Sequence, residues 1–252
     1  MELVAWEISL LIVAGVAGGF INVMAGGGSV ITVPVMIFLG VPGPVANGTN
    51  RLPILAHNTA AALTYLRHGL PHSGMVLSLS VCAIPGAVAG ALVGARLPAE
   101  TFNMLLAAVM AAVMLLLLTE TDRAESIPAT KISPRRNALG HLLMVLAGFW
   151  GGFIQIGMGF VLLPILNRVL GMDLVAANIH KVFIILLYTI SALLVFGSEL
   201  ELLWWVGAVM AVGNTLGGWM GARLTLTGDN QIIRAIVILA IVSMIVKLIW
   251  FT

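Results

Sequence analysis

The chain has 252 residues, of which 60% are hydrophobic and only 9% are charged, and its mean hydropathy is +1.11. Soluble domains carry about 25% charged residues. So few charges cannot cover a water-facing surface, and lipid must therefore surround most of the chain. The net charge of +2 and the scattered basic residues argue against nucleic-acid binding. The single cysteine, Cys82, argues against a dithiol redox carrier, which needs a pair.

Ten apolar segments follow one another along the chain. They cover residues 5–24, 29–40, 45–66, 73–95, 99–118, 138–158, 160–170, 174–196, 202–224 and 230–251. Most approach the roughly 20 residues that a helix needs to cross about 30 Å of hydrocarbon. Two segments, 29–40 and 160–170, are too short, and each follows a glycine-rich break. Short, interrupted segments at corresponding places in two halves point to a transporter binding site.

The two halves of the chain repeat the same features in the same order. Gly18-Gly19-Phe20-Ile21-Asn22 corresponds to Gly151-Gly152-Phe153-Ile154-Gln155, Pro34 to Pro164, and Ala46-Asn47 to Ala177-Asn178. The run Gly86-x3-Gly90-x3-Gly94-Ala95-Arg96-Leu97 corresponds to Gly213-x3-Gly217-x3-Gly221-Ala222-Arg223-Leu224. Four-residue glycine spacing predicts close packing of helix backbones, within one chain or between two copies of a homodimer. An internal repeat of this kind is typical of transporters.

Residues 119–137 form the most polar connection, and we interpret them as a cytoplasmic linker between a first repeat (1–118) and a second (138–252). If each half has five segments, an odd number, the second half has the opposite orientation in the membrane to the first. With the N-terminus outside, eight basic residues then lie on the cytoplasmic side and two outside, leaving aside Arg51 and Lys181. If each broken segment counts as one crossing, each half has four crossings, and at best six basic residues lie on one side and four on the other. We therefore expect an all-α polytopic membrane protein with two inverted repeats and broken or re-entrant helices at the glycine breaks.

Two cations lie away from the segment ends. Arg51 is near the start of segment 45–66, and Lys181 occupies the matching place in the second half, within one position. A buried charge in a bilayer is costly and is usually paired. All ten acidic residues lie at or near segment ends, so the sequence offers few counter-charges, and a bound anion would supply one. The alternative is that both cations snorkel or bond to carbonyl groups freed by the broken helices.

The glycine breaks predict a second element that favours anions. Gly28-Ser29 and Gly159-Phe160 each open a short helix, whose N-terminus presents unpaired N–H groups and a partial positive charge, and Gly27 lies within the first break. Further side chains could donate hydrogen bonds to an anion between these ends: Asn22, Ser29, Thr32, Thr49, Asn50 and Gln155. Met158 lies inside the second break, where it would contact a substrate or simply pack.

Two histidines are candidates for a proton relay. His57 and His180 lie in or near the membrane, and His180 adjoins Lys181. A hydrogen-bonded structural role explains each of them equally well. No H-E-x-x-H, G-x-S-x-G, P-loop or metal-ligand cluster is present, so no metal site is expected. Missing motifs argue only weakly against an enzyme, but the repeat and the broken helices favour transport over catalysis.

The chain resembles the sulfite exporter TauE/SafE family of membrane permeases. The resemblance rests on Gly18-Gly19-Phe20-Ile21-Asn22-x3-Gly26-Gly27-Gly28-Ser29-x4-Pro34, on Gly40-Val41-Pro42, on Asn47-Gly48-Thr49 and on Pro85-Gly86-x3-Gly90-x3-Gly94, and it covers nearly the whole chain. It implies a carrier in the bacterial plasma (inner) membrane for sulfite, thiosulfate or an organosulfonate such as sulfoacetate, without a cofactor. Arg51 departs from the more apolar stretch of many members, which marks it as a candidate determinant of the substrate.

Our leading hypothesis is an alternating-access carrier in which Arg51 and Lys181 attract a small anion, with a proton or sodium ion as a candidate for coupling. Two alternatives stay open on the sequence. A passive anion channel would give unitary currents, which a carrier does not. A membrane subunit of a sulfur-handling complex would need a partner protein.

Overall fold

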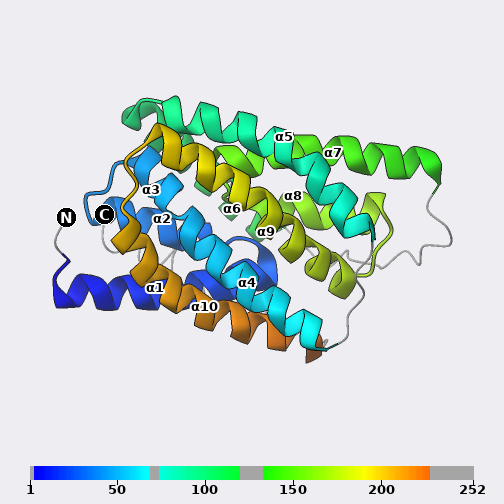
Figure 1. Ribbon diagram of the computed structural model, residues 1–252, viewed down its shortest axis with the longest axis horizontal. Coiled ribbons are helices and arrows are strands. Elements are labelled where there is room, and N and C mark those ends of the chain that lie inside the picture. Colours follow the sequence, from blue (N-terminus) through cyan, green and yellow to red (C-terminus); the bar gives the residue numbers. More distant parts are fainter. Residues whose placement is uncertain (1–2, 69–73, 120–132, 228–252) are drawn as a thin grey trace.

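The computed structural model describes residues 3–68, 74–119 and 133–227, and every regular element in these ranges is a helix. Figure 1 shows them in chain order. The elements are α1 (Ala5–Ala25), α2 (Ser29–Phe38), α3 (Gly43–Thr49), α4 (Arg51–Arg67), α5 (Gly74–Arg96), α6 (Ala99–Thr119), α7 (Pro134–Phe153), α8 (Met158–Pro164), the π-helix η1 (Ile165–Val169), α9 (Leu174–Glu199) and α10 (Trp204–Thr227).

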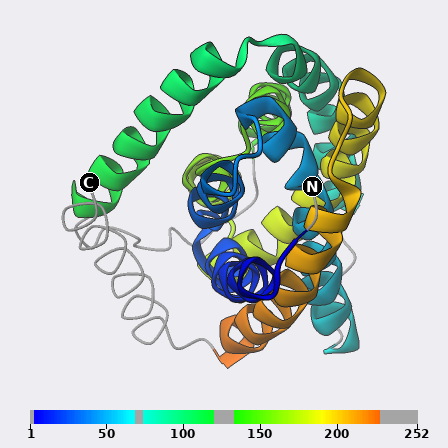
Figure 2. The same ribbon diagram turned by 90° about the vertical axis from the view of Figure 1, so that its left-hand side faces the viewer.

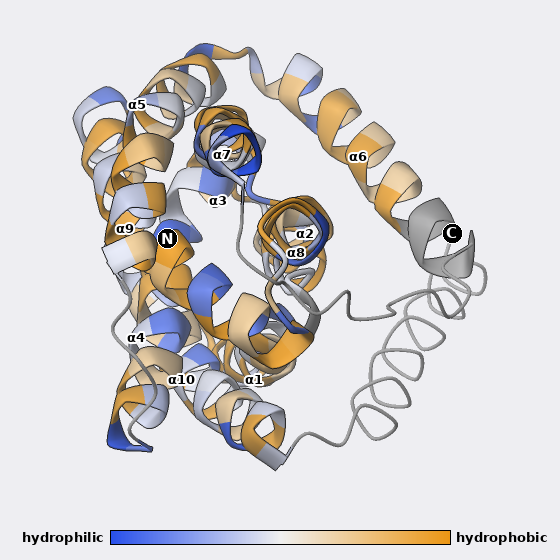
Figure 3. Cartoon of the chain, turned by 90° about the vertical axis from the view of Figure 1, so that its right-hand side faces the viewer, coloured by the Kyte–Doolittle hydropathy of each residue, from blue (hydrophilic) through white to orange (hydrophobic). Residues whose placement is uncertain are grey.

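Three of the described helices are long and apolar enough to cross a membrane: Ala5–Met24 within α1, all of α5 and all of α9. Large apolar side chains point outward from several helices. Val13 on α1, Met104 on α6 and Leu194 on α9 are each about two-thirds exposed. Figure 3 shows hydrophobic residues predominating along α6, at the edge of the bundle. These faces need lipid around them, which confirms the prediction of an all-α membrane protein.

Several helix boundaries differ from the predicted segments, and the predicted segment 160–170 is α8 followed by η1. The predicted segment 45–66 is two helices, α3 and α4, which meet at Asn50. Helix α7 begins at Pro134, inside the predicted linker 119–137, because Ser133 Oγ caps it by accepting from the Arg136 N–H at 3.3 Å. It also ends at Phe153, five residues before the predicted segment does. The rest of the linker, 119–132, lies almost wholly outside the described residues, as does the predicted segment 230–251.

The helices pack in pairs that mirror the sequence repeat. Helix α1 packs along α10, and α5 packs along α7. Because α1 corresponds to α7 and α5 to α10 in the repeat, these two pairs are counterparts of each other. Helix α4 packs against α10, and α9 packs against α5. Since α4 corresponds to α9 in the repeat, these two pairs are also counterparts of each other. Each major pair therefore joins one half of the chain to the other, as Figure 2 shows for α1 and α10.

The repeated glycines lie where these paired helices meet. A Cβ on Gly86 or Gly90 would overlap the backbone oxygen of Val145 or Phe149 on α7. In the other pair, Gly213 and Gly217 stand in the same relation to Ile12 and Val16 on α1. The prediction of close helix packing is confirmed, and these glycine faces pack within one chain.

Candidate functional site

The two glycine breaks meet inside the molecule. The N–H of Gly159 donates to the backbone oxygen of Gly26 at 3.2 Å. A Cβ on Gly26 would overlap the backbone of Gly159, and Gly26 has a φ of 78°, so only glycine fits there. Gly157, in the second break, has a φ of 74°. The chain therefore brings together the two predicted breaks, from which α2 and α8 begin.

Arg51 is the first residue of α4 and is completely buried. Its Nη1 donates to the backbone oxygen of Gly151 at 2.5 Å and to Gln155 Oε1 at 2.6 Å. Its Nη2 donates to the backbone oxygen of Gly152 at 2.7 Å and to Asn47 Oδ1 at 3.3 Å. All four acceptors are neutral, so the structure surrounds a full positive charge with dipoles only.

The two backbone acceptors, the oxygens of Gly151 and Gly152, lie in the last turn of α7. The last carbonyl groups of a helix have no partner within it and carry partial negative charge, which a cation stabilises. Asn47 adds a further bond to this end, because its Nδ2 donates to the backbone oxygen of Phe153 at 2.8 Å. The Phe196 ring lies 5.1 Å from the guanidinium carbon of Arg51, within cation–π range.

Lys181 has the equivalent arrangement in the other half. It is completely buried on α9, and its Nζ donates to the backbone oxygens of Asn22 at 3.2 Å and Val23 at 2.9 Å. These carbonyl groups belong to the C-terminal turns of α1, the counterpart of α7. Each cation thus binds the end of the first helix of the opposite half, immediately before its glycine break.

Neither cation has an acidic partner among the described residues. The ion pair found there joins Arg96 to Glu199 at 2.9 Å, at the ends of α5 and α9. Asp173, the acidic residue nearest Lys181 in sequence, instead caps α9 by accepting from the Ala176 N–H at 2.8 Å. Of the two explanations that need no substrate, snorkelling is wrong because both cations are fully buried, and bonding to freed carbonyl groups is what the structure has.

Gln155 links Arg51 to a residue that the sequence did not indicate. Its Oε1 accepts from Arg51 and from the hydroxyl of Tyr188 at 3.1 Å. Gln155 has a φ of 63°, the one positive φ of a non-glycine residue in the described ranges. Strained backbone of this kind gathers at functional sites. Tyr188 is one of two tyrosines in the chain, and a tyrosine inside an apolar helix needs a partner for its hydroxyl, which was the available signal.

The same neighbourhood contains buried polar atoms without a hydrogen-bond partner. They are Arg51 Nε, Gln155 Nε2, Asn50 Oδ1 and Thr189 Oγ1. The first two are donors on side chains that are bonded to each other. Leaving a buried donor unpaired costs about 1–3 kcal/mol. Two such donors beside a fixed cation suit a ligand that carries hydrogen-bond acceptors and negative charge.

The remaining predicted residues lie in the surrounding structure. Ser29 Oγ accepts from Asn50 Nδ2 at 3.3 Å, which ties the start of α2 to the junction of α3 and α4. Thr49 Oγ1 accepts from the Leu203 N–H at 3.2 Å, and so fixes the approach to α10. Gly28 packs against the backbone of Gly18. The side chains of Asn22 and Thr32 are buried, and Gly27 lies near Phe160 and Ile21.

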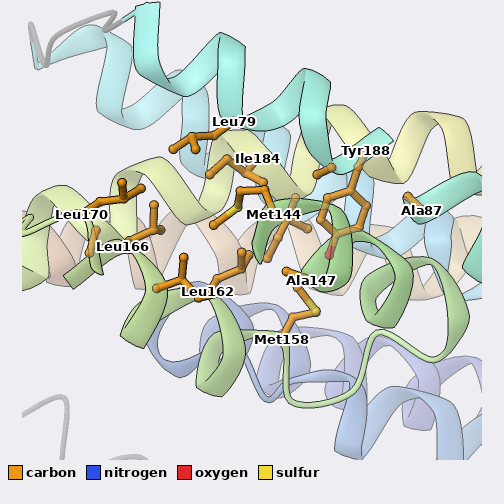
Figure 4. Close-up of a cluster of buried hydrophobic side chains, with 14 of the residues drawn as sticks. Leu79, Ala87, Met144, Ala147, Met158, Leu162, Leu166, Leu170, Ile184 and Tyr188 are labelled. Carbon is orange, nitrogen blue, oxygen red and sulfur yellow. The ribbon is translucent and has the colours of Figure 1, made fainter. Parts of the chain in front are cut away.

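Met158 is completely buried in an apolar cluster. Figure 4 shows its side chain among those of Ala147, Leu162 and Tyr188, drawn from α7, α8 and α9. Its packing role is therefore established, and contact with a substrate stays a prediction. In Figure 4 the hydroxyl end of Tyr188 points toward Ala147 and Met158 of this cluster.

His57 has partners on both ring nitrogens. Nε2 lies 2.9 Å from Asn58 Nδ2, and Nδ1 lies 3.0 Å from Asn214 Oδ1. Both amide orientations are fixed by further bonds, from Asn58 Nδ2 to the Ile54 oxygen and from Asn214 Nδ2 to the Met210 oxygen. Nε2 therefore accepts and Nδ1 donates, which fits a neutral, structural ring.

His180 Nδ1 lies 2.7 Å from the backbone oxygen of Ala176. A proton relay through His180 or His57 stays a prediction. Among the residues that the structure describes, no three His, Cys, Asp or Glu side chains gather as metal ligands would.

Comparison with known proteins agrees with a membrane transporter. A family model described as "Sulfite exporter TauE/SafE" matches residues 11–248. A probable membrane transporter protein of Sinorhizobium is 27% identical over 96% of this chain and 92% of its own. A probable membrane transporter protein of Haemophilus influenzae is 26% identical over 96% of this chain and 94% of its own. The probable membrane transporter protein YfcA of Escherichia coli K12 is 25% identical over 96% of this chain and 90% of its own. No solved structure matches significantly.

The family match spans almost the whole chain, and the relatives align along nearly their full length. Together with the apolar helices and the paired glycine breaks, it identifies a membrane transport protein. The chain belongs to the sulfite exporter TauE/SafE family.

Proposed function

We propose that this protein is a secondary transporter that moves a small sulfur-containing anion across the bacterial plasma membrane by alternating access. Sulfite, thiosulfate and organosulfonates such as sulfoacetate are the candidate substrates. The family description, sulfite exporter, supports this substrate class. The proposal assigns the protein no catalytic role.

The observation that carries the proposal is the environment of Arg51. Its guanidinium is completely buried and has only neutral partners in the described residues. Arg51 Nε and Gln155 Nε2 are donors without acceptors. A sulfur oxyanion carries several acceptor oxygens and a negative charge, so one ligand would satisfy both donors and neutralise the cation.

The packing of the halves supports alternating access. Neither Arg51 nor Lys181 is exposed to solvent, so an anion reaches them only after helices move. The exchanged pairs α1–α10 and α5–α7 are what two inverted repeats would form around a shared axis. In this scheme the glycine-packed pairs move as units, and the breaks at Gly26 and Gly157 lie at their centre.

The test is transport by the purified protein in liposomes. Uptake of labelled sulfite, thiosulfate and sulfoacetate is compared with that of acetate, chloride and taurine, which is zwitterionic. We expect one or more sulfur anions to exchange, and Arg51→Ala to abolish the exchange. Arg96→Ala is the control, because Arg96 is an exposed arginine at a helix end, its side chain 67% accessible. Exchange of no anion by the native protein, or normal exchange by Arg51→Ala, would contradict the proposal.

A further inference from the structure

The two buried cations occupy equivalent places but differ in one chemical property. A guanidinium stays charged in proteins, whereas a buried lysine ammonium can give up its proton. The repeat therefore contains one permanent charge, Arg51, and one exchangeable charge, Lys181. This difference deepens the proposed function, on which the inference rests.

The contacts of Lys181 suit either protonation state. An ammonium group has three protons and a neutral amine has two. Lys181 Nζ makes two hydrogen bonds, to the backbone oxygens of Asn22 and Val23. A neutral Lys181 could keep both bonds, so losing the third proton would leave α1 in place. Arg51 also donates four bonds through its two terminal nitrogens, and it keeps its charge because a guanidinium is not deprotonated in proteins.

Among the residues that the structure describes, no acidic group pairs with Lys181. On α4, His57 lies within electrostatic range of Lys181, and its ring is fully bonded to Asn58 and Asn214. Other titratable or charged groups on the described elements that pack against α9 are Arg51, Tyr65 and Arg67 on α4, Cys82 and Arg96 on α5, Arg135, Arg136 and His141 on α7, Arg168 on η1, Glu7 on α1 and Arg223 on α10. On α9 itself they are His180, Tyr188 and Glu199, and Asp173 is its N-cap. The described carboxylates among them make no ion pair with Lys181.

We propose that Lys181 carries the coupling proton of this transporter. With the site open to one side, Lys181 takes a proton from water, and the positive charge then retains the anion beside Arg51. After the site opens to the other side, the anion leaves and the Lys181 ammonium releases its proton to water. One proton therefore moves with each anion in the same direction, and a monovalent anion crosses without net charge.

The test uses an organosulfonate whose own charge is constant over the pH range, so that only the protein titrates. Liposomes containing native protein, Lys181→Arg or Arg51→Ala receive a pH gradient without an anion gradient. We expect native protein to accumulate the labelled anion on the alkaline side. Lys181→Arg keeps a fixed charge, so it should exchange the anion across the membrane and accumulate none. Arg51→Ala should do neither.

Each other outcome is decisive. Accumulation by Lys181→Arg would overturn the assignment of the proton to Lys181. Exchange without accumulation by the native protein would overturn proton coupling and leave the proposed function intact. Absence of any exchange by the native protein would contradict the proposed function itself.

A second measurement covers the case in which Lys181→Arg does not fold. Calorimetry of anion binding to native protein in detergent, in buffers of different ionisation enthalpy, counts the protons bound with the anion. With the buffer pH set so that the free protein is mainly deprotonated at Lys181, we expect uptake of about one proton for each anion. Binding without proton uptake at any pH would overturn the inference.

Discussion

The ends of α7 and α1 are equivalent in the repeat, yet they are built differently. Helix α1 continues to Ala25, three residues beyond Asn22, whereas α7 ends at Phe153, two residues before Gln155. Gln155 is therefore outside the helix, and its side chain reaches Arg51 and Tyr188. Asn22 remains helical, and Lys181 contacts its backbone oxygen instead. The end of α7 is therefore part of a side-chain hydrogen-bond network that contains two donors without acceptors. The end of α1 is bound by Lys181 through backbone oxygens alone.

Replacement of Arg51 or Lys181 by alanine should have the largest effect on anion transport. We expect Arg51→Ala and Lys181→Ala each to reduce anion transport about 100-fold or more, because a buried charge that faces a ligand is lost. Arg51→Ala should also lower the melting temperature more than Lys181→Ala, since it removes four hydrogen bonds and not two. Equal transport by native and variant proteins would remove both residues from the site.

Substitution of the packed glycines should show where the two halves are alike. A Cβ on Gly90 would overlap the Phe149 oxygen, and one on Gly217 would overlap the Val16 oxygen. We expect Gly90→Val and Gly217→Val to destabilise the protein by similar amounts, about 1–3 kcal/mol or more, through overpacking. Thermal melting in detergent measures both, and Gly74→Val is the control, because a Cβ there would have no described atom within 4 Å. A large difference between Gly90 and Gly217 would contradict the equivalence of the pairs.

Replacement of the two amides by leucine should sharpen the contrast. Gln155→Leu removes the acceptor shared by Arg51 and Tyr188 together with a free donor, so we expect anion affinity to fall about 10-fold or more. Asn22→Leu keeps the backbone oxygen that Lys181 binds, and its effect should be several-fold smaller. Binding titrations measure both constants. An Asn22→Leu loss as large as that of Gln155→Leu would show that the ends work alike.

Removal of the Tyr188 hydroxyl should have the smallest effect. Tyr188→Phe deletes one hydrogen bond of 3.1 Å to Gln155 and keeps the ring in its apolar cluster. Such a bond contributes about 0.5–1.5 kcal/mol, which predicts a loss of anion affinity of roughly 2- to 13-fold. The same titration measures it. An unchanged affinity would mean that Tyr188 supports the core and does not position Gln155.

The sequence predicted the helices, the glycine breaks and the two buried cations, because apolar length, four-residue glycine spacing and isolated charges are local signals. It did not reveal that Arg51 and Lys181 bind the helix ends of the opposite half, since that depends on how the halves exchange partners. Tyr188 was missed because its bond to Gln155 depends on how α9 packs against the end of α7 within the second half. The split at Asn50 was missed, although the polar run Asn47-Gly48-Thr49-Asn50-Arg51 was an available signal of an interruption.

Equilibrium binding of a sulfur anion to the purified protein, measured for the native chain and for Arg51→Ala, tests the central claim most directly. Melting temperatures are recorded over a concentration series of sulfite, thiosulfate and sulfoacetate, with chloride and acetate as controls, because a ligand that binds only the folded state raises the melting temperature. We predict stabilisation of the native protein by at least one sulfur anion and none of Arg51→Ala. Equal stabilisation of both proteins would place the anion elsewhere and contradict the account of the Arg51 site.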